Sequence, residues 1–332
     1  MKSSINRNRR IAFFLLAVFA LSALALAGCR KGGGGGAGGK GGKIVIGFSQ
    51  MENDGPWRIA ETTSMKNEAA KRGEKFELVI TDAQGQTAKQ VSDVEDLIAR
   101  GVDAIFLAPR EKEGLAPAVQ AAKQANIPVF LVDREAAGVA GVDFVTVLKS
   151  DFVEQGRRAG EWLAKQSNGK ANIIELTGTP GASVTDDRAK GFKDEIAKHP
   201  EMKIIASQTG NFTRAEGQKV MQNIIQSKGK EITAVYAHND EMALGAIQAL
   251  KSAGMTPGKD VLVVSVDGER AALEAITRGE MNASVESNPR FGPLAFDTLE
   301  KFLKGEKLPP RIILEDKFFD SNNAAKFVNE AY

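Results

Sequence analysis

The chain is poor in the residues that bind transition metals and form disulfides. It has 332 residues but one cysteine and two histidines, so an intrachain disulfide is excluded and a zinc site of Cys and His ligands is not expected. Aromatic residues make up only 6% of the chain, with two tryptophans. With 42% hydrophobic and 26% charged residues, the composition is that of a globular protein of about two domains, which argues against a disordered chain or a polytopic membrane protein.

The chain also has no excess of basic residues outside its leader. The formal net charge is +2, but residues 1–28 contain four basic side chains and no acidic one. Without these four charges the net charge is −2, so a broad nucleic-acid-binding surface is not expected. The glycine-rich stretch at 32–42 contains no G-x-G-x-x-G between a strand and a helix, and the sequence gives no reason to expect a cofactor or a metal.

Residues 1–28 are predicted to be a bacterial secretion signal. A basic start is followed by an uncharged run, Ile11 to Ala27, and by small residues. A transmembrane helix is the alternative, because the run is near the lower length limit for spanning. Leu26 to Cys29 reads Leu-Ala-Gly-Cys, which resembles the lipobox of bacterial lipoproteins. This resemblance implies cleavage before Cys29 and a lipid on its thiol, with an uncleaved anchor or a plain exported protein as the other interpretations.

Residues 29–42 are predicted to form a glycine-rich tether. Such a segment cannot bury enough apolar surface to offset the entropy lost on ordering. A glycine chain of this length has a mean end-to-end distance of about 20 Å. We therefore expect a folded body just outside a membrane, attached by a lipid and a flexible segment.

From residue 43 onward, apolar runs of four to six residues alternate with longer helical stretches. This rhythm predicts an α/β fold with βαβ units around parallel sheets. Strands are expected at 43–48, 76–81, 104–108, 129–132, 171–176, 203–207, 233–237 and 261–266, and helices at 57–72, 88–100, 115–125, 187–198, 213–227 and 241–253.

Two parts of the body repeat the same pattern. Residues 102–109 and 232–239 are each followed by a helix and then by a buried strand that ends on an aspartate, Asp133 or Asp267. The repeat predicts two similar lobes. Ligands of open α/β sheets bind beyond the carboxyl ends of the strands, so facing lobes would place both aspartates on one cleft.

The residues expected at that cleft suit a neutral sugar. Asp and Asn accept hydrogen bonds from paired hydroxyls, Arg donates a two-pronged fork, and aromatic rings cover C–H faces. An aspartate after a strand can instead cap the next helix, and a tryptophan can pack within a lobe. We expect Asn239 to face the ligand and Asp240 to cap the following helix. Arg188 is expected to open its helix, where an arginine is unfavourable for the helix dipole and fits a cleft role better.

Several stretches carry a resemblance to a known family: Gly47 to Gln50, Gly101 to Pro109, Val129 to Arg134, Arg188 to Phe192 and Ala237 to Ala246. On these residues the chain resembles the periplasmic sugar-binding proteins of the ribose-binding class, which deliver substrates to ABC transporters. Within that class, the stretches Gly55 to Glu61, Gly181 to Val184, Gly210 to Arg214 and Asn282 to Glu286 are similar to galactofuranose-binding members.

The resemblance implies two Rossmann-like lobes with parallel sheets, joined by a three-stranded hinge near Leu148, Ser287 and Phe318. The N-terminal lobe would comprise 43–148 and 288–317, and the C-terminal lobe 149–287 and 318–332. A sugar would bind between the lobes of a monomer, and the closed form would dock on a membrane permease.

The resemblance also implies the binding residues: Ser49, Gln50, Trp57, Arg58, Asp133 and Arg134 in the N-terminal lobe, Arg188, Phe212, Asn239 and Asp267 in the C-terminal lobe, and Glu286, or the adjacent Ser287 and Asn288, at the hinge. Ribose binders have two phenylalanines where this chain has Trp57 and Arg58, so the resemblance implies a sugar with an extra polar arm. No catalytic residue is implied.

Three other functions share part of this pattern. A chemotaxis or signalling ligand carrier would use the same binding chemistry. Asp133 and Asp267 could imitate a glycosidase dyad, although the chain has no G-x-S-x-G elbow of a hydrolase. A repressor of this fold would need a helix-turn-helix where the leader lies.

Overall fold

The computed structural model describes residues 42–332. The predicted signal sequence, the predicted lipidation site Cys29 and nearly all of the glycine-rich tether lie outside this range. Within it, no helix combines the length and apolar character needed to cross a membrane.

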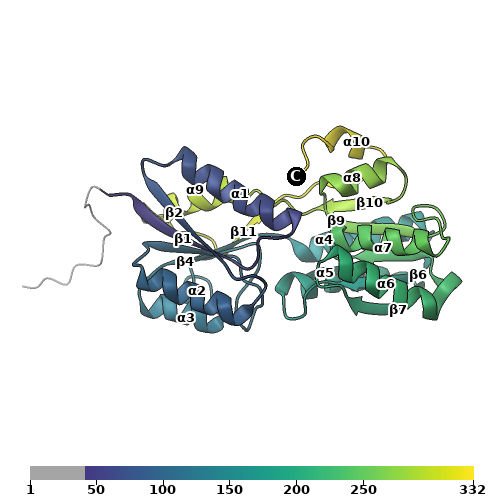
Figure 1. Cartoon of the computed structure of the whole chain (residues 1–332), viewed down its shortest axis with the longest axis horizontal. Helices are drawn as coiled ribbons and strands as arrows, with labels where there is room; N and C mark the ends of the chain where they lie inside the picture. The colour runs from purple at the N-terminus through teal and green to yellow at the C-terminus, as the bar shows by residue number, and fades with distance from the viewer. Residues whose placement is uncertain (1–41) are drawn as a thin grey trace, which may run out of the picture. The chain divides into compact units, whose positions relative to one another are not determined.

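The N-terminal lobe is a sheet of six parallel strands in the order β11-β5-β4-β3-β1-β2. Helices α1 and α9 cover one face and α2 and α3 the other (Figure 1). Its elements are β1 (Ile44–Gln50), α1 (Pro56–Lys71), β2 (Phe76–Asp82), α2 (Thr87–Ala99), β3 (Ala104–Leu107), α3 (Ala116–Gln124), β4 (Val129–Val132), β5 (Thr146–Ser150), α9 (Gly292–Leu303) and β11 (Arg311–Leu314).

The C-terminal lobe repeats this plan with the order β12-β10-β9-β8-β6-β7, in which only β12 is antiparallel to its neighbour. Its elements are α4 (Phe152–Gln166), β6 (Lys170–Thr177), α5 (Ser183–Ile196), β7 (Glu201–Thr209), α6 (Arg214–Lys228), the 3-10 turn η1 (Gly229–Glu231), β8 (Ala234–Ala237), α7 (Asp240–Ser252), β9 (Leu262–Asp267), α8 (Arg270–Thr277), β10 (Ala283–Glu286), β12 (Phe318–Asp320) and α10 (Ala324–Phe327).

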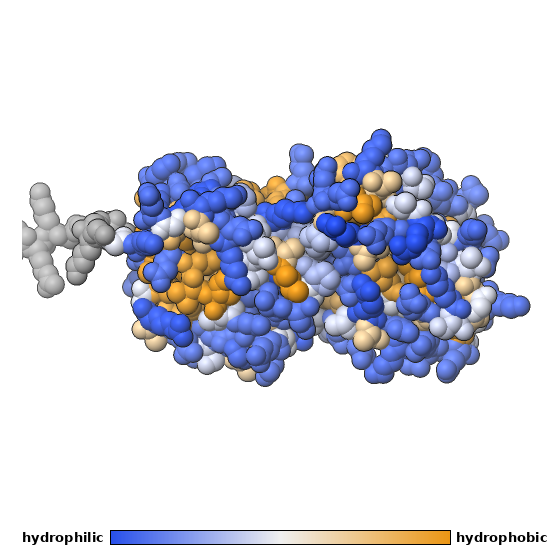
Figure 2. Space-filling view, turned by 45° about the horizontal axis from the view of Figure 1, so that its top comes forward, coloured by the Kyte–Doolittle hydropathy of each residue, from blue (hydrophilic) through white to orange (hydrophobic). Residues whose placement is uncertain are grey.

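The central strands are buried on both faces, which explains why they are continuous apolar runs. In β3, Phe106 packs with α1 and α9 on one side, whereas Ile105 and Leu107 pack with α2 and α3 on the other. β8 is divided in the same way between α4–α5 and α6–α7. Polar residues cover most of the outer surface on the face shown in Figure 2, with apolar atoms gathered in its hollows. The predicted α/β class with parallel sheets is confirmed.

The chain crosses between the lobes three times. It leaves β5 for α4, leaves β10 for α9, and leaves β11 for β12. Ser287 lies in the second crossing, and Phe318 begins β12, where the third crossing ends. The expected boundary at residue 148 falls inside β5, because β5 pairs with β11 as far as Ser150.

The helices and strands at 146–166 and beyond residue 267 were not among the elements expected from the apolar rhythm. Strand β11 has alternating exposure and sits at a sheet edge, so its sequence lacks the continuous apolar run of a central strand.

Candidate functional site

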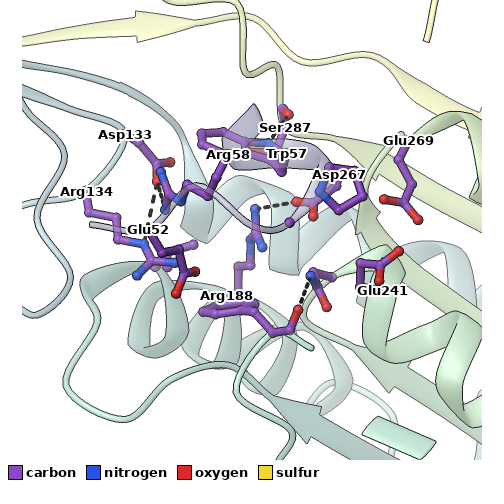
Figure 3. A pocket seen from close by; sticks show the side chains of 15 residues that line it. Glu52, Trp57, Arg58, Asp133, Arg134, Arg188, Glu241, Asp267, Glu269 and Ser287 are labelled. Carbon is purple, nitrogen blue, oxygen red and sulfur yellow. Dashed lines mark hydrogen bonds and ion pairs between the residues drawn. The ribbon is translucent and has the colours of Figure 1, made fainter. Parts of the chain in front are cut away.

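A cavity between the two lobes brings together most of the predicted binding residues (Figure 3). Trp57, Arg58, Asp133, Arg134, Arg188, Phe212, Asn239 and Asp267 line it, together with Glu52, Gly55, Pro56, Val184, Glu241, Glu269 and Ser287. In agreement with the rule for open sheets, most of these residues follow the carboxyl ends of strands or open the helices behind them, whereas Arg188 lies further along its helix.

A buried ion pair forms the N-terminal side of the cavity. Arg58, only 5% exposed, donates from Nη2 to Asp133 Oδ2 at 2.7 Å and from Nη1 to Glu61 Oε2 at 2.8 Å. Burial works to lower the pKa of Arg58, but Asp133 and Glu61 outweigh it and raise that pKa. The guanidinium also lies 4.5 Å from the centre of the Trp57 ring. Removing either carboxylate would leave a buried positive charge with too few partners.

A second arginine–aspartate pair forms the C-terminal side. Arg188 Nη2 donates to Asp267 Oδ1 at 3.3 Å, and Nη1 donates to the carbonyl oxygen of His238. Burial raises the pKa of Asp267 well above its ordinary value, although the charge of Arg188 opposes this rise. Each lobe therefore presents a guanidinium and a carboxylate to the same cavity.

Three of the cavity residues have backbone conformations that L-amino acids rarely adopt. The φ angles are +65° at Asp133, +62° at Phe212 and +135° at Asp267. Each such conformation costs free energy and persists only where the surrounding structure holds it. The amide of Asp133, for example, donates to the carbonyl oxygen of Leu148 in β5 at 2.8 Å. Strain of this kind concentrates at ligand sites, where it fixes the direction of a side chain before the ligand arrives.

The two aromatic rings of the cavity are held in different ways. Trp57 Nε1 donates to the carbonyl oxygen of Ser287 at 2.8 Å, which ties the N-terminal lobe to the second crossing. The Phe212 ring lies over Gly178, where a Cβ atom would be 1.9 Å from ring atom Cζ. Arg134, from the other lobe, lies 5.1 Å from the centre of the Phe212 ring.

Arg134 has hydrogen-bonding capacity left for a ligand. Its Nη1 donates to the carbonyl oxygen of Arg110 at 3.2 Å, while its buried Nε has no hydrogen-bond partner among residues 42–332. Burial, with the nearby charge of Arg58, lowers the pKa of Arg134 to about 9. A ligand oxygen beside this guanidinium would therefore be well placed to accept a hydrogen bond.

Three of the predicted binding residues do not line the cavity. Gln50 Nε2 donates to Glu61 Oε2 at 2.8 Å, so Gln50 supports the carboxylate that holds Arg58. Ser49 is fully buried within β1. Glu286 accepts from the amide of Lys317 at 2.8 Å in the third crossing, and its neighbour Ser287, named with it as the hinge-side candidate, lines the cavity in its place.

The expected roles of Asn239 and Asp240 are corrected. Asn239 itself caps α7, because its Oδ1 accepts from the amide of Met242 at 3.0 Å while it also lines the cavity. Asp240 is fully buried and accepts from Ser265 Oγ of β9, from Ser284 Oγ of β10 at 2.7 Å and from the amide of Glu269 at 2.8 Å. Asp240 therefore binds strands β9 and β10 together instead of capping the helix.

The expectation that Arg188 opens its helix is wrong. Helix α5 begins at Ser183, so Arg188 lies in its second turn. The earlier start places Val184 and Arg188 on the same side of α5, facing the cavity. The argument from the helix dipole therefore does not apply to Arg188. Its position in the cavity is explained by its contacts with His238 and Asp267.

Sequence reasoning missed three acidic residues of the cavity wall: Glu52, Glu241 and Glu269. Glu269 is only two positions beyond Asp267, so its nearness to a predicted site residue was the available signal. Burial, reinforced by the negative charges of Asp240 and Glu241, raises the pKa of Glu269 to about 10. At neutral pH Glu269 can therefore donate a hydrogen bond as well as accept one.

Taken together, the cavity offers hydrogen-bond donors, acceptors and two rings, a set suited to a polyhydroxylated ligand. In the part of the chain that the structure describes, no three His, Cys, Asp or Glu side chains are grouped so that they could hold a metal ion.

Comparison with known proteins gives the same family for nearly the whole body. The family model of the periplasmic binding protein domain matches residues 46–307. The galactofuranose-binding protein YtfQ of Escherichia coli (strain K12) is 46% identical over 274 residues, which cover 82% of this chain and 86% of that protein.

Solved structures agree with this result. A crystal structure of a galactofuranose binding protein has a TM-score of 0.84 and 43% sequence identity, covering 86% of this chain and 98% of that one. The periplasmic binding protein of the arabinose ABC transporter from Shewanella sp. ANA-3, bound to α- and β-L-arabinofuranose, has a TM-score of 0.83 and 43% identity, covering 86% of this chain and 95% of that one.

The buried carboxyl groups predict an unusual dependence of stability on pH. Burial raises the pKa of Glu61 to about 7, of Asp240 to about 6 and of Glu269 to about 10. The unfolded chain has ordinary carboxyl pKa values near 4, so between about pH 7.5 and about pH 5.5 the folded protein binds more protons. Stability should therefore increase as the pH falls through this window.

His238 acts in the opposite direction, because burial lowers its pKa and the unfolded chain takes up its proton first below about pH 6.5. One histidine opposes these three carboxyl groups and also Asp267 and Asp316, whose pKa values burial raises in the same direction. The melting temperature measured by calorimetry should therefore rise by a few degrees on acidification. Asp240→Asn should make the rise smaller. A melting temperature that falls over the whole window would contradict the raised pKa values.

Proposed function

The chain belongs to the periplasmic binding protein family, and on this premise we propose that it captures a monosaccharide between its two lobes and delivers it to an ABC importer. The proposed ligand is galactofuranose or a closely related furanose or pyranose. The observation that carries the proposal is that each lobe presents a buried arginine–aspartate pair, Arg58–Asp133 and Arg188–Asp267, to one shared cavity.

Sugar hydroxyls suit these two pairs. An ionised carboxylate can accept from two neighbouring hydroxyls, and the guanidinium beside it can donate to hydroxyl and ring oxygens. The rings of Trp57 and Phe212 supply apolar surface for the C–H face of the sugar. The matches to proteins whose names and titles state galactofuranose or arabinofuranose support a five-membered ring.

The extra polar groups favour a sugar with an exocyclic arm. Beyond the two ion pairs, the cavity wall contains Glu52, Glu241 and Glu269. A pentose without an arm would leave some of these groups without hydroxyl partners, which costs binding free energy when the groups are desolvated. The two hydroxyls beyond the ring of galactofuranose would supply partners.

Binding would stabilise the closed arrangement of the lobes. Only a ligand that interacts more strongly with the closed form than with the open form shifts this equilibrium. A micromolar dissociation constant corresponds to about −8 kcal/mol. A few charge-assisted hydrogen bonds at about 1.5–3 kcal/mol each and one stacked ring are sufficient for that value.

We also propose how the protein is attached and that it performs no reaction. Members of this family are exported. Residues 1–28 would be removed, Cys29 would carry the lipid, and the glycine-rich tether would hold a monomeric body against the membrane. The sugar would leave for the permease with every bond unchanged, because Asp133 and Asp267 are each engaged with an arginine.

Calorimetric titration with a panel of sugars tests the proposed function. Galactose should bind with a micromolar dissociation constant, and NMR of the bound sugar should show the furanose form. Ribose should bind at least roughly tenfold more weakly, because its furanose form has one hydroxyl beyond the ring where galactofuranose has two. The sugar recovered after a long incubation should be unchanged. Binding of no sugar in the panel would contradict the proposal, as would release of product from a nitrophenyl glycoside.

A substitution beneath Phe212 tests the role of the ring. In Gly178→Ala, the new methyl group would displace the partly buried ring, because the added Cβ atom would lie 1.9 Å from its Cζ atom. We expect sugar affinity to fall by roughly 2- to 10-fold, the value of one stacked ring, with little change in melting temperature. Phe212→Ala should give a similar loss. Adding Gly178→Ala to Phe212→Ala should have no further effect, and an additive loss would show that Gly178 acts by another route.

A further inference from the structure

All three chain crossings meet at one side chain, Asp316. Asp316 lies in the third crossing, between β11 and β12. Its Oδ1 accepts from Ser150 Oγ at 3.1 Å and from the amide of Asn288 at 3.3 Å. Ser150 ends β5, where the first crossing begins, and Asn288 lies in the second crossing. Burial raises the pKa of Asp316 to about 6, so the carboxylate is mainly ionised above neutral pH and can accept all of these hydrogen bonds.

A single buried amide joins this carboxylate to the cavity. Gln155, on α4 and only 1% exposed, donates from Nε2 to Asp316 Oδ2 at 2.8 Å and to the carbonyl oxygen of Glu286 at 3.1 Å. Its Oε1 accepts from Arg188 Nε at 2.9 Å. The orientation of the amide is therefore fixed at both ends, because the oxygen must face an arginine and the nitrogen must face a carboxylate.

Close packing of α4 on α5 places Gln155 beside Arg188. A Cβ atom on Gly156 would lie 2.2 Å from the carbonyl oxygen of Arg188, and one on Gly191 would lie 1.9 Å from that of Val153. Only glycine at these two positions allows the helix backbones to approach so closely. The two helices therefore form a rigid support between the cavity and the crossings.

We infer that Gln155 is a positioning residue which couples the cavity guanidinium of Arg188 to the three crossings through Asp316. This inference rests on the proposed function. Neither Gln155 nor Asp316 lines the cavity, so neither would touch the sugar. Asp316 and the carbonyl oxygen of Glu286 together orient the amide of Gln155, whose oxygen holds Arg188 toward Asp267, and Asp316 contributes to this only while the three crossings keep the arrangement seen here. Sugar binding at Arg188 and closure at the crossings therefore stabilise each other.

Two variants that exchange the amide of Gln155 and the carboxylate of Asp316, first singly and then together, test the coupling at about pH 7.5. Gln155→Glu keeps an acceptor for Arg188 but places a carboxylate oxygen against Asp316 and the carbonyl oxygen of Glu286, so the two hydrogen bonds donated by the Gln155 amide are lost while the one to Arg188 is kept. In Gln155→Glu with Asp316→Asn, the new amide nitrogen can donate to Glu while its oxygen still accepts from Ser150 and Asn288. We expect the single variant to weaken sugar binding by roughly tenfold and the double variant to restore it to within about threefold.

Two further variants distinguish a loss of coupling from a general loss of folding stability. Asp316→Ala should weaken binding although the residue does not line the cavity, whereas Asp320→Ala, the matched acidic residue on β12, should not. Asp316→Ala and Asp320→Ala also test the coupling if Gln155→Glu does not fold. Wild-type affinity in both Gln155→Glu and Asp316→Ala would overturn the inference, as would a double variant that binds as weakly as Gln155→Glu.

The interlobe distance gives a second measurement that does not depend on affinity. Fluorescent labels on the two lobes should show a smaller closed fraction in Gln155→Glu than in the wild type, and recovery in the double variant. If the wild type binds no sugar, the proposed function fails. The distances in the ligand-free variants then decide the coupling by themselves, because equal closed fractions in all variants would overturn it.

Discussion

The buried arginines of the cleft need carboxylate partners, and the rest of the site follows from this constraint. Arg134 lies 3.5 Å from Asp133, and the other two arginines are paired more closely. Arg58 is paired with Asp133 and Glu61, and Arg188 with Asp267. Each pair is supported from behind by a glutamine, Gln50 through Glu61 in one lobe and Gln155 in the other. The two lobes therefore repeat the supporting arrangement as well as the fold. Sugar hydroxyls can form hydrogen bonds with both pairs while each arginine keeps the carboxylate that compensates its buried charge.

The strained backbone conformations in the cavity also hold its charged side chains in place. Asp133 and Asp267 end strands in conformations with positive φ, so their carboxylates are directed by the sheets and not by flexible loops. Because these side chains are already ordered, a ligand loses little binding free energy in ordering them. Most of its binding free energy can then favour closure. The crossings, by contrast, are short segments that meet through hydrogen bonds to Asp316.

The sequence was sufficient for the parts of the site that depend on local patterns. Buried strands are continuous apolar runs, and the aspartates after two of them occur at matching places in the repeat, so Asp133 and Asp267 could be found directly. Side chains whose partners are distant in the chain could not be assigned in this way. Gln155 meets Asp316 across 161 positions, and nothing in either segment indicates the contact. Likewise Asn239 and Asp240 are both good caps, and only the extended backbone of Asn239 decides between them.

The central claim is that one sugar molecule is bound by both arginine–aspartate pairs at the same time. A crystal structure of the protein grown with saturating galactose tests this most directly. The account predicts sugar density in the cavity, with hydroxyls of one molecule within hydrogen-bonding distance of both Asp133 and Asp267 and a ring face against Phe212. Sugar bound to one lobe only, or bound elsewhere while the cavity holds water, would contradict it.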